Sequence, residues 1–193
     1  IARARQLLQA QETTTIVDMG TGSGNIAVSL AVHLPQARVL ACDVSETAVA
    51  LTQYHAEKHA VADRVQVLCG DMFTPLADEG IAGQVDIVVC NPPYIPTGSL
   101  ANLATEIIEH EPVVALDAGA YGIDIFRRLI RGAQDFLKPG GLLAFEIGAG
   151  QHRMAARLVQ KNKGYETAVP IKLDSIIRVI TAIKKETASE RER

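Results

Sequence analysis

The chain has 193 residues, of which 48% are hydrophobic and 21% are charged, and its formal net charge at pH 7 is -3. This is the composition of an ordinary globular protein, long enough for one domain to bury a core without disulfide or metal cross-links. A negative net charge, with no dense Lys/Arg cluster along the sequence, argues against nucleic acid as the preferred partner. No apolar run approaches the roughly 20 residues that span a bilayer, and no secretory pattern opens the chain, so we expect a cytoplasmic protein that does not enter the membrane.

Helical and extended patterns alternate along the chain, which predicts a doubly wound α/β domain. Residues 1–11 predict a helical lead-in. The predicted strands are residues 15–17, 38–43, 65–69, 85–90, 142–147, 167–171 and 176–183. The predicted helices are residues 25–34, 45–60 (with Ser45 as N-cap), 123–136 and 154–161, and a turn is predicted at 138–141. The sheet is expected to be mostly parallel, with helices on both faces.

The first predicted strand runs into a glycine-rich turn, D-M-G-T-G-S-G at residues 18–24. Glycines at alternate positions, Gly20, Gly22 and Gly24, allow positive φ angles and let a ligand approach bare backbone. The dinucleotide fingerprint places its third glycine one residue later, so this spacing favours a nucleoside ligand without a pyrophosphate. A plain strand-to-helix connection also fits the glycines taken alone.

Acidic residues close the next two predicted strands. Asp43 lies 19 residues beyond Gly24, near the position at which a strand-end acid accepts hydrogen bonds from ribose hydroxyls. The alternative is an acid that stabilises the following helix N-terminus. Asp71 can accept a hydrogen bond from an exocyclic amine, and Met72 can offer a polarisable surface to a flat base. A turn acid beside a buried methionine fits these two residues equally well.

The sequence N-P-P-Y follows the fourth predicted strand directly. Two consecutive prolines, Pro92 and Pro93, hold the backbone rigid where the strand ends. The amide oxygen of Asn91 and the carbonyl of Pro92 present two acceptors, which suit an NH2 group, while Tyr94 supplies a flat aromatic wall. The alternative is a proline-stiffened loop with a satisfied asparagine. Residues 95–121 form an irregular stretch too long for an idle connection, and we expect them to shape a substrate pocket.

The cysteines and histidines predict no metal site. Cys42, Cys69 and Cys90 each end an apolar run, where cysteine usually behaves as a small buried hydrophobe, and their spacing suits neither zinc nor a disulfide framework. His55 and His59 share one helix face, but no third ligand is near them in sequence. We expect both to be solvated helix residues.

The chain resembles the class I S-adenosylmethionine-dependent methyltransferases through residues 18–24, Asp43, Gly70-Asp71 and N-P-P-Y. More narrowly, it is similar to the PrmC/HemK family of protein glutamine N5-methyltransferases, which modify the G-G-Q glutamine of peptide chain release factors. The narrower resemblance lies in E-P-V-V-A-L-D-A-G (111–119), G-I-D-I-F-R-R-L-I (122–130), L-K-P-G-G (137–141) and F-E-I-G (145–148).

The resemblance implies a Rossmann-like fold with a seven-stranded sheet and a late antiparallel strand, S-adenosylmethionine as cofactor and a release factor as protein partner. It implies a methyltransferase domain at residues 15–183, between a lead-in at 1–14 and a charged tail at 184–193 that we expect to be disordered. The implied cofactor-binding residues are Gly20, Thr21, Gly22, Ser23, Gly24, Asp43, Asp71, Met72 and Asn91. The implied substrate-binding residues are Asn91, Pro92, Pro93 and Tyr94, of which Asn91, Pro92 and Tyr94 are implied to be catalytic.

The chain departs from the family pattern in two places. Family members usually carry an N-terminal helical domain, whereas here only residues 1–11 precede the first predicted strand. We expect either an excised catalytic domain, whose lead-in is a remnant of the missing domain or a linker to it, or a short relative. The family's late D-L-x-G-x-x-R-V pattern appears as D-S-I-I-R-V at residues 174–179, without its glycine. Two other functions stay open: adenine-N6 methylation of nucleic acid, and a cofactor-binding subunit that depends on a partner.

Overall fold

The described part of the chain folds around one sheet of seven strands. The computed structural model describes residues 13–92, 123–173 and 175–186. The first part contains β1 (Thr14–Met19), α2 (Asn25–His33), β2 (Ala37–Asp43), α3 (Glu46–Lys58), β3 (Val65–Cys69), the short 3-10 helix η1 (Thr74–Leu76) and β4 (Val85–Cys90). The remainder contains α6 (Asp124–Phe136), β5 (Leu137–Glu146), α7 (His152–Lys161), β6 (Val169–Leu173) and β7 (Ile176–Ile183).

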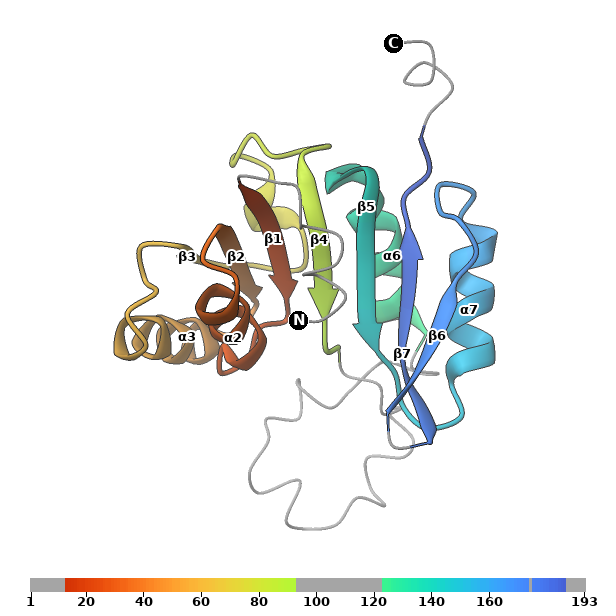
Figure 1. Cartoon of the computed structure of the whole chain (residues 1–193), viewed down its shortest axis with the longest axis horizontal. Coiled ribbons are helices and arrows are strands. Elements are labelled where there is room, and N and C mark those ends of the chain that lie inside the picture. The colour runs from red at the N-terminus through yellow and green to blue at the C-terminus, as the bar shows by residue number, and fades with distance from the viewer. Residues whose placement is uncertain (1–12, 93–122, 174, 187–193) are drawn as a thin grey trace.

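The strands lie in the order β3-β2-β1-β4-β5-β7-β6 (Figure 1). Strands β1 to β5 pair in parallel, whereas β7 is antiparallel to both of its neighbours, β5 and β6. The prediction of a mostly parallel seven-stranded sheet with a late antiparallel strand is therefore confirmed.

Helices cover both faces of the sheet, as predicted, and each face has its own core. Along β1, Ile16 packs on the side of α2 and α3, whereas Val17 and Met19 pack on the side of α6 and α7. The alternation follows from the strand geometry, in which successive side chains point to opposite faces. Both faces being covered explains why β1 and β4 are almost entirely buried.

Apart from the start of β5, the predicted element boundaries hold to within two residues. The predicted N-cap of α3 is confirmed, since the Ser45 hydroxyl accepts a hydrogen bond from the Ala48 amide at 3.3 Å. Strand β6 begins two residues later than predicted and α7 two residues earlier. The lead-in at residues 1–11, and residues 187–193 of the predicted tail, lie outside the described residues.

The predicted turn at residues 138–141 lies within β5 instead of before it. Val85 pairs with Leu137 and Ile87 with Leu142. An advance of two residues along β4 therefore corresponds to an advance of five residues along β5. The extra residues form a bulge in which Gly140 has a φ of 74°. The sheet continues because Gly140 and Gly141 exchange backbone hydrogen bonds with Lys184. Backbone pairing thus extends past the predicted domain end at 183.

The cysteines divide according to their place in the sheet. Cys42 and Cys90, on central strands, are buried as predicted, and burial raises the pKa of Cys42 to about 12 and that of Cys90 well above its usual value. The prediction that Cys69 is buried is wrong, because β3 is an edge strand and the Cys69 side chain is exposed. Within the described residues, no helix is both long and apolar enough to cross a membrane.

Candidate functional site

The predicted site residues of four strands meet at one edge of the sheet. Met19 pairs with both Cys42 and Cys90, so Gly20, Asp43 and Asn91 each follow or end a strand at the same level. Asp71 comes after β3, which pairs with β2. Three strand spacings of about 4.8 Å place the ends of β3 and β4 about 14 Å apart. The order of strands reverses between β1 and β4, which is where open α/β sheets bind ligands.

The glycine turn leaves its backbone open to a ligand. Gly20, Gly22 and Gly24 all have positive φ, at 69°, 59° and 83°. A Cβ added to Gly20 or Gly22 would meet nothing within 4 Å, whereas one added to Gly24 would lie 2.9 Å from Cγ2 of Thr52. The first two glycines therefore expose the turn, and the third lets α3 pack against it.

Asp18 holds this turn, a role that the sequence analysis did not assign. Its side chain is fully buried, and Oδ2 accepts hydrogen bonds from the Thr21 hydroxyl at 2.8 Å and the Ala27 amide at 3.0 Å. Oδ1 is buried with no partner among the described residues. Burial raises the Asp18 pKa from 3.8 to about 6, although the bonds from Thr21 and Ala27 oppose that shift. An acid inside an apolar strand just before the glycines was the signal available in the sequence.

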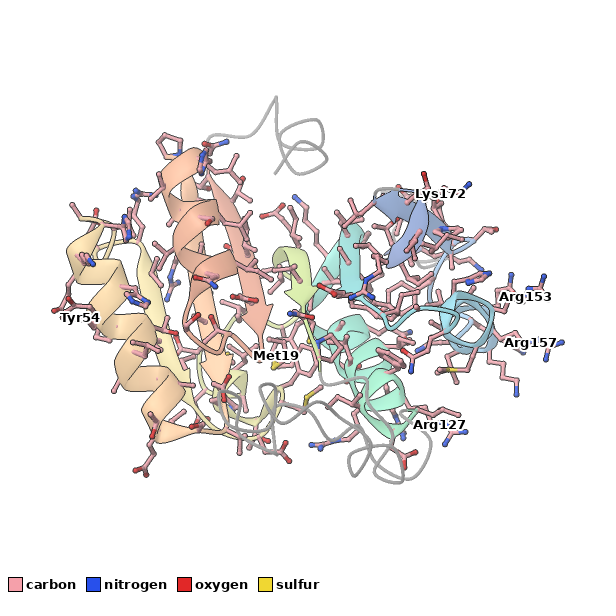
Figure 2. All side chains as sticks on the ribbon, turned by 90° about the horizontal axis from the view of Figure 1, so that it is seen from below. Met19, Tyr54, Arg127, Arg153, Arg157 and Lys172 are labelled. Carbon is pink, nitrogen blue, oxygen red and sulfur yellow. The ribbon has the colours of Figure 1, made fainter. Side chains whose placement is uncertain are left out.

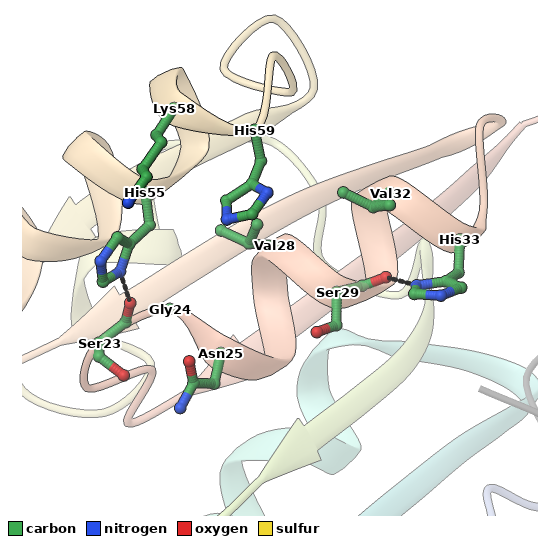
Figure 3. A pocket seen from close by; sticks show the side chains of 10 residues that line it. All are labelled: Ser23, Gly24, Asn25, Val28, Ser29, Val32, His33, His55, Lys58 and His59. Atoms are coloured by element: carbon green, nitrogen blue, oxygen red, sulfur yellow. Dashed lines mark hydrogen bonds between the residues drawn. The ribbon is translucent and has the colours of Figure 1, made fainter.

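Helix α3 fixes the turn from the other side. The Thr52 hydroxyl donates to the Gly22 carbonyl at 3.0 Å, and Nδ1 of His55 lies 2.7 Å from the Ser23 carbonyl oxygen (Figure 3). Because a carbonyl oxygen can only accept, Nδ1 carries the proton. The prediction that His55 is solvated is therefore wrong: it is half-buried and bound to the turn, whereas His59 is exposed as expected.

A hollow of about 280 Å³ lies between α2 and α3, next to these contacts (Figure 3). Ser23 and Gly24 of the turn form one end of it, and His55 and Lys58 of α3 form its wall. It is thus on the helix side of the turn, away from the ends of β2 and β3. The predicted nucleoside residues Asp43 and Asp71 are not part of its lining.

Asp43 binds the start of α3, as one of its two predicted roles requires, and it keeps hydrogen-bonding capacity for the other. Its Oδ2 accepts from the Gly22 amide at 2.9 Å, which joins β2 to the glycine turn. Its Oδ1 accepts from the amide of Ser45, the N-cap of α3, also at 2.9 Å. A carboxylate has about four lone-pair sites, so two remain for the hydroxyls of a ribose.

Asp71 and Met72 form the end of the site beyond β3. Asp71 is exposed, and its Oδ2 accepts from Arg128 of α6 at 2.6 Å, while its backbone carbonyl accepts from the Thr74 hydroxyl. Met72 is half-buried at a φ of 50°. The ion pair orients the carboxylate and adds a residue, Arg128, that the sequence analysis did not connect with the site.

Asn91 and Pro92 follow β4 as predicted. Pro92 is buried, whereas the Asn91 side chain is exposed and makes no hydrogen bond to another described residue. Pro93, Tyr94 and the stretch at 95–121 lie outside the described residues. Across residues 13–92, 123–173 and 175–186, no group of three or more His, Cys, Asp or Glu side chains is placed to hold a metal ion.

The residues at this edge fit a nucleoside cofactor that carries an amino-acid chain. Bare backbone at Gly20 and Gly22 provides room for the chain. The buried Oδ1 of Asp18, which has no partner in the part of the chain that the structure describes, lies in the strand that leads into this turn. The spare lone pairs of Asp43 suit a ribose. Strands β1, β2 and β3 are neighbours in the sheet. A ligand lying along this edge would therefore meet the glycine turn, Asp43 and Asp71 in that order.

Comparisons with known proteins place the chain among methyltransferases. The family model for the methyltransferase small domain matches residues 4–121. The release factor glutamine methyltransferase of Moorella thermoacetica is 46% identical over 154 residues, 80% of this chain and 53% of that protein. The protein of the same name from Geobacter sulfurreducens is 43% identical over 145 residues, 75% and 49% of the two chains. The chain spans about half the length of the curated relatives it matches.

Solved structures share the fold at lower identity. A methyltransferase from Pyrococcus furiosus superimposes with a TM-score of 0.63 at 17% identity, over 96% of this chain and 83% of its own. An O-methyltransferase predicted in Agrobacterium tumefaciens gives a TM-score of 0.64 at 18% identity, over 93% and 78% of the two chains. At these identities the similarity concerns the fold alone.

Proposed function

The chain belongs to the methyltransferase small domain family, and from that premise we propose that it methylates the side-chain amide nitrogen of a glutamine in a peptide chain release factor. Relatives at 43 to 46% identity are named for this activity. The observation that supports it best is the position of Asn91 and Pro92, at the end of β4 beside the glycine turn of β1. We also propose that the protein works in the cytoplasm, where a release factor is available.

The cofactor of this proposal is S-adenosylmethionine, which supplies a methyl group on a positively charged sulfur when it is bound. Residues 20–24 would hold its methionine part and Asp43 its ribose. Asp71 and Met72 would lie beside its adenine. Asn91, at the end of the neighbouring strand, would lie next to the reacting end of the cofactor.

Asn91 and Pro92 would prepare the acceptor nitrogen. An amide nitrogen is a poor nucleophile, because its lone pair is delocalised into the carbonyl. The Asn91 side-chain oxygen and the Pro92 carbonyl can each accept one of its two N–H hydrogens, which would hold the nitrogen in line for attack. Both acceptors would also stabilise the positive charge that develops on that nitrogen during transfer.

No general base is required by this arrangement. The Asn91 side chain does not titrate, and the Pro92 carbonyl serves only as an acceptor. After transfer the methylated nitrogen loses its extra proton readily to water. Residues 91–94 would thus act by orientation and by electrostatic stabilisation.

Labelled S-adenosylmethionine offered together with three acceptors tests the proposal: a release factor, a ribosomal protein and DNA. We expect label in the release factor, located by mass spectrometry on the glutamine of its G-G-Q loop, and no label with Asn91→Ala. Label in DNA would contradict the proposal and favour adenine methylation. Label in the release factor only after a second protein is added would favour the partner-dependent subunit.

A further inference from the structure

Positive and negative charges are distributed unevenly between the earlier and the later described residues of the chain. Residues 13–92 carry nine Asp or Glu against three Lys or Arg. Residues 123–173 and 175–186 carry twelve Lys or Arg against five Asp or Glu. The fold places these later residues together, because α6, α7, β5, β6 and β7 form one end of the molecule (Figure 1).

Helix α7 carries a row of positive charge and no acidic residue of its own. Arg153, Arg157 and Lys161 follow one another at four-residue intervals, so all three lie on one side of the helix, and all are exposed. Figure 2 shows Arg153 and Arg157 projecting away from the body of the protein. The helix contains no acidic residue, and like charges at this spacing repel one another. An anionic partner would relieve that repulsion.

Neighbouring elements extend the row into a surface, which we call the basic face. It consists of Arg127 and Arg131 of α6, Arg153, Arg157 and Lys161 of α7, and Lys172 of β6, all of them exposed. Figure 2 shows the labelled members on the same side of the molecule, at the end opposite Tyr54 of α3. Arg127 pairs with Asp124 of its own helix, and the other five form no ion pair with a described residue.

The basic face begins near the edge of the sheet that carries Asp43, Asp71 and Asn91. Arg128, next to Arg127 at the start of α6, reaches Asp71 at that edge. Helix α7 starts six residues after Glu146, the end of β5, so Arg153 in its first turn lies near the same level. A macromolecule whose acceptor group reaches Asn91 would therefore extend naturally over this face.

We infer that the basic face docks an acidic surface of the protein substrate, an inference that rests on the function proposed above. Guanidinium groups match carboxylates in bidentate pairs. Nucleic acid fits less well, because the described aromatic residues near the face offer little surface for base stacking. Phe126, Phe145 and Tyr165 are buried, and the half-buried Phe136 is stacked on Phe73. The acids of residues 13–92 would also repel a continuous phosphate backbone running toward the site.

Binding of a purified release factor to the full chain tests this inference by calorimetry. We expect Arg157→Glu to weaken binding several-fold, and Arg153→Glu with Arg157→Glu together to weaken it about tenfold or more. The salt dependence of Kd should also be smaller in the double variant. Lys58→Glu is the matched control for the single variant: it makes the same charge change at an exposed helix position of α3. Unchanged affinity for S-adenosylhomocysteine would show that each variant is folded.

The outcomes separate the two proposals. Equal Kd values for Arg157→Glu and Lys58→Glu, or no binding of the release factor by the wild type, would overturn the docking inference. Loss of duplex RNA binding in the double variant, with unchanged release factor binding, would also overturn it. If the wild type binds the release factor in the predicted charge-dependent way without methylating it, the docking inference holds and the proposed function is wrong.

Discussion

Replacing Gly22 by alanine tests whether the open space above the glycine turn belongs to the cofactor. A Cβ at this position would touch no protein atom within 4 Å, so the folded protein would suffer only the strain of a φ of 59°. That strain costs about 1–2 kcal/mol for a residue other than glycine. The reduced freedom of the unfolded chain returns about 0.4–1 kcal/mol. The net loss of about 1 kcal/mol predicts a Tm lowered by roughly 2–4 °C.

Gly83→Ala is the matched control. Gly83 has a φ of 69°, and its Cβ would likewise meet nothing within 4 Å, but it precedes β4 and so lies at the opposite edge of the sheet. Thermal unfolding should therefore give similar Tm losses for the two variants. Calorimetric titration with S-adenosylhomocysteine should separate them, because only the Gly22 variant places a methyl group where the ligand is expected. We expect at least tenfold weaker binding for Gly22→Ala and none of this loss for Gly83→Ala. Equal affinities would refute the placement of the cofactor.

Three further predictions concern residues around the turn and the acceptor. Asn91→Ala should lower kcat by about 100-fold or more while leaving the Kd of S-adenosylhomocysteine within about twofold, and parallel losses in both would exclude its proposed role. Because burial raises the Asp18 pKa from 3.8 to about 6, its contribution to stability is fully present below pH 3.8 and is lost as the pH rises through 6, which amounts to about 3 kcal/mol. Urea unfolding across this range should show that loss in the wild type and not in Asp18→Asn, and identical pH profiles would contradict the assignment. His55→Ala should weaken S-adenosylhomocysteine binding several-fold by freeing the Ser23 carbonyl, whereas His59→Ala should not, and equal affinities for the two variants would argue against this contact.

The grouping of the candidate site residues could be predicted from the sequence because it depends on strand ends. A parallel sheet brings the carboxyl ends of its strands to one edge, so recognising the strands before Gly20, Asp71 and Asn91 was enough to bring those residues together. The glycine turn required only local information, since its three positive φ angles belong to alternate residues of one short segment.

Features that depend on distant partners could not be predicted. The segment at 138–141 has the composition of a turn, and it stays in the sheet because Lys184, more than forty residues later, pairs with it. His55 has the spacing of a solvated helix residue, and only the packing of α3 brings it to Ser23. The basic face could not be predicted for the same reason. Its residues come from three elements that only the fold brings together, and the net charge of the whole chain also includes the acidic residues of the earlier part.

A crystal structure of the protein with S-adenosylhomocysteine would test the central claim most directly. The account predicts the ribose hydroxyls on the Asp43 carboxylate, the amino-acid chain against Gly20 and Gly22, and the sulfur facing the Asn91 amide. A ligand found in the hollow between α2 and α3, or a sulfur far from Asn91, would contradict it.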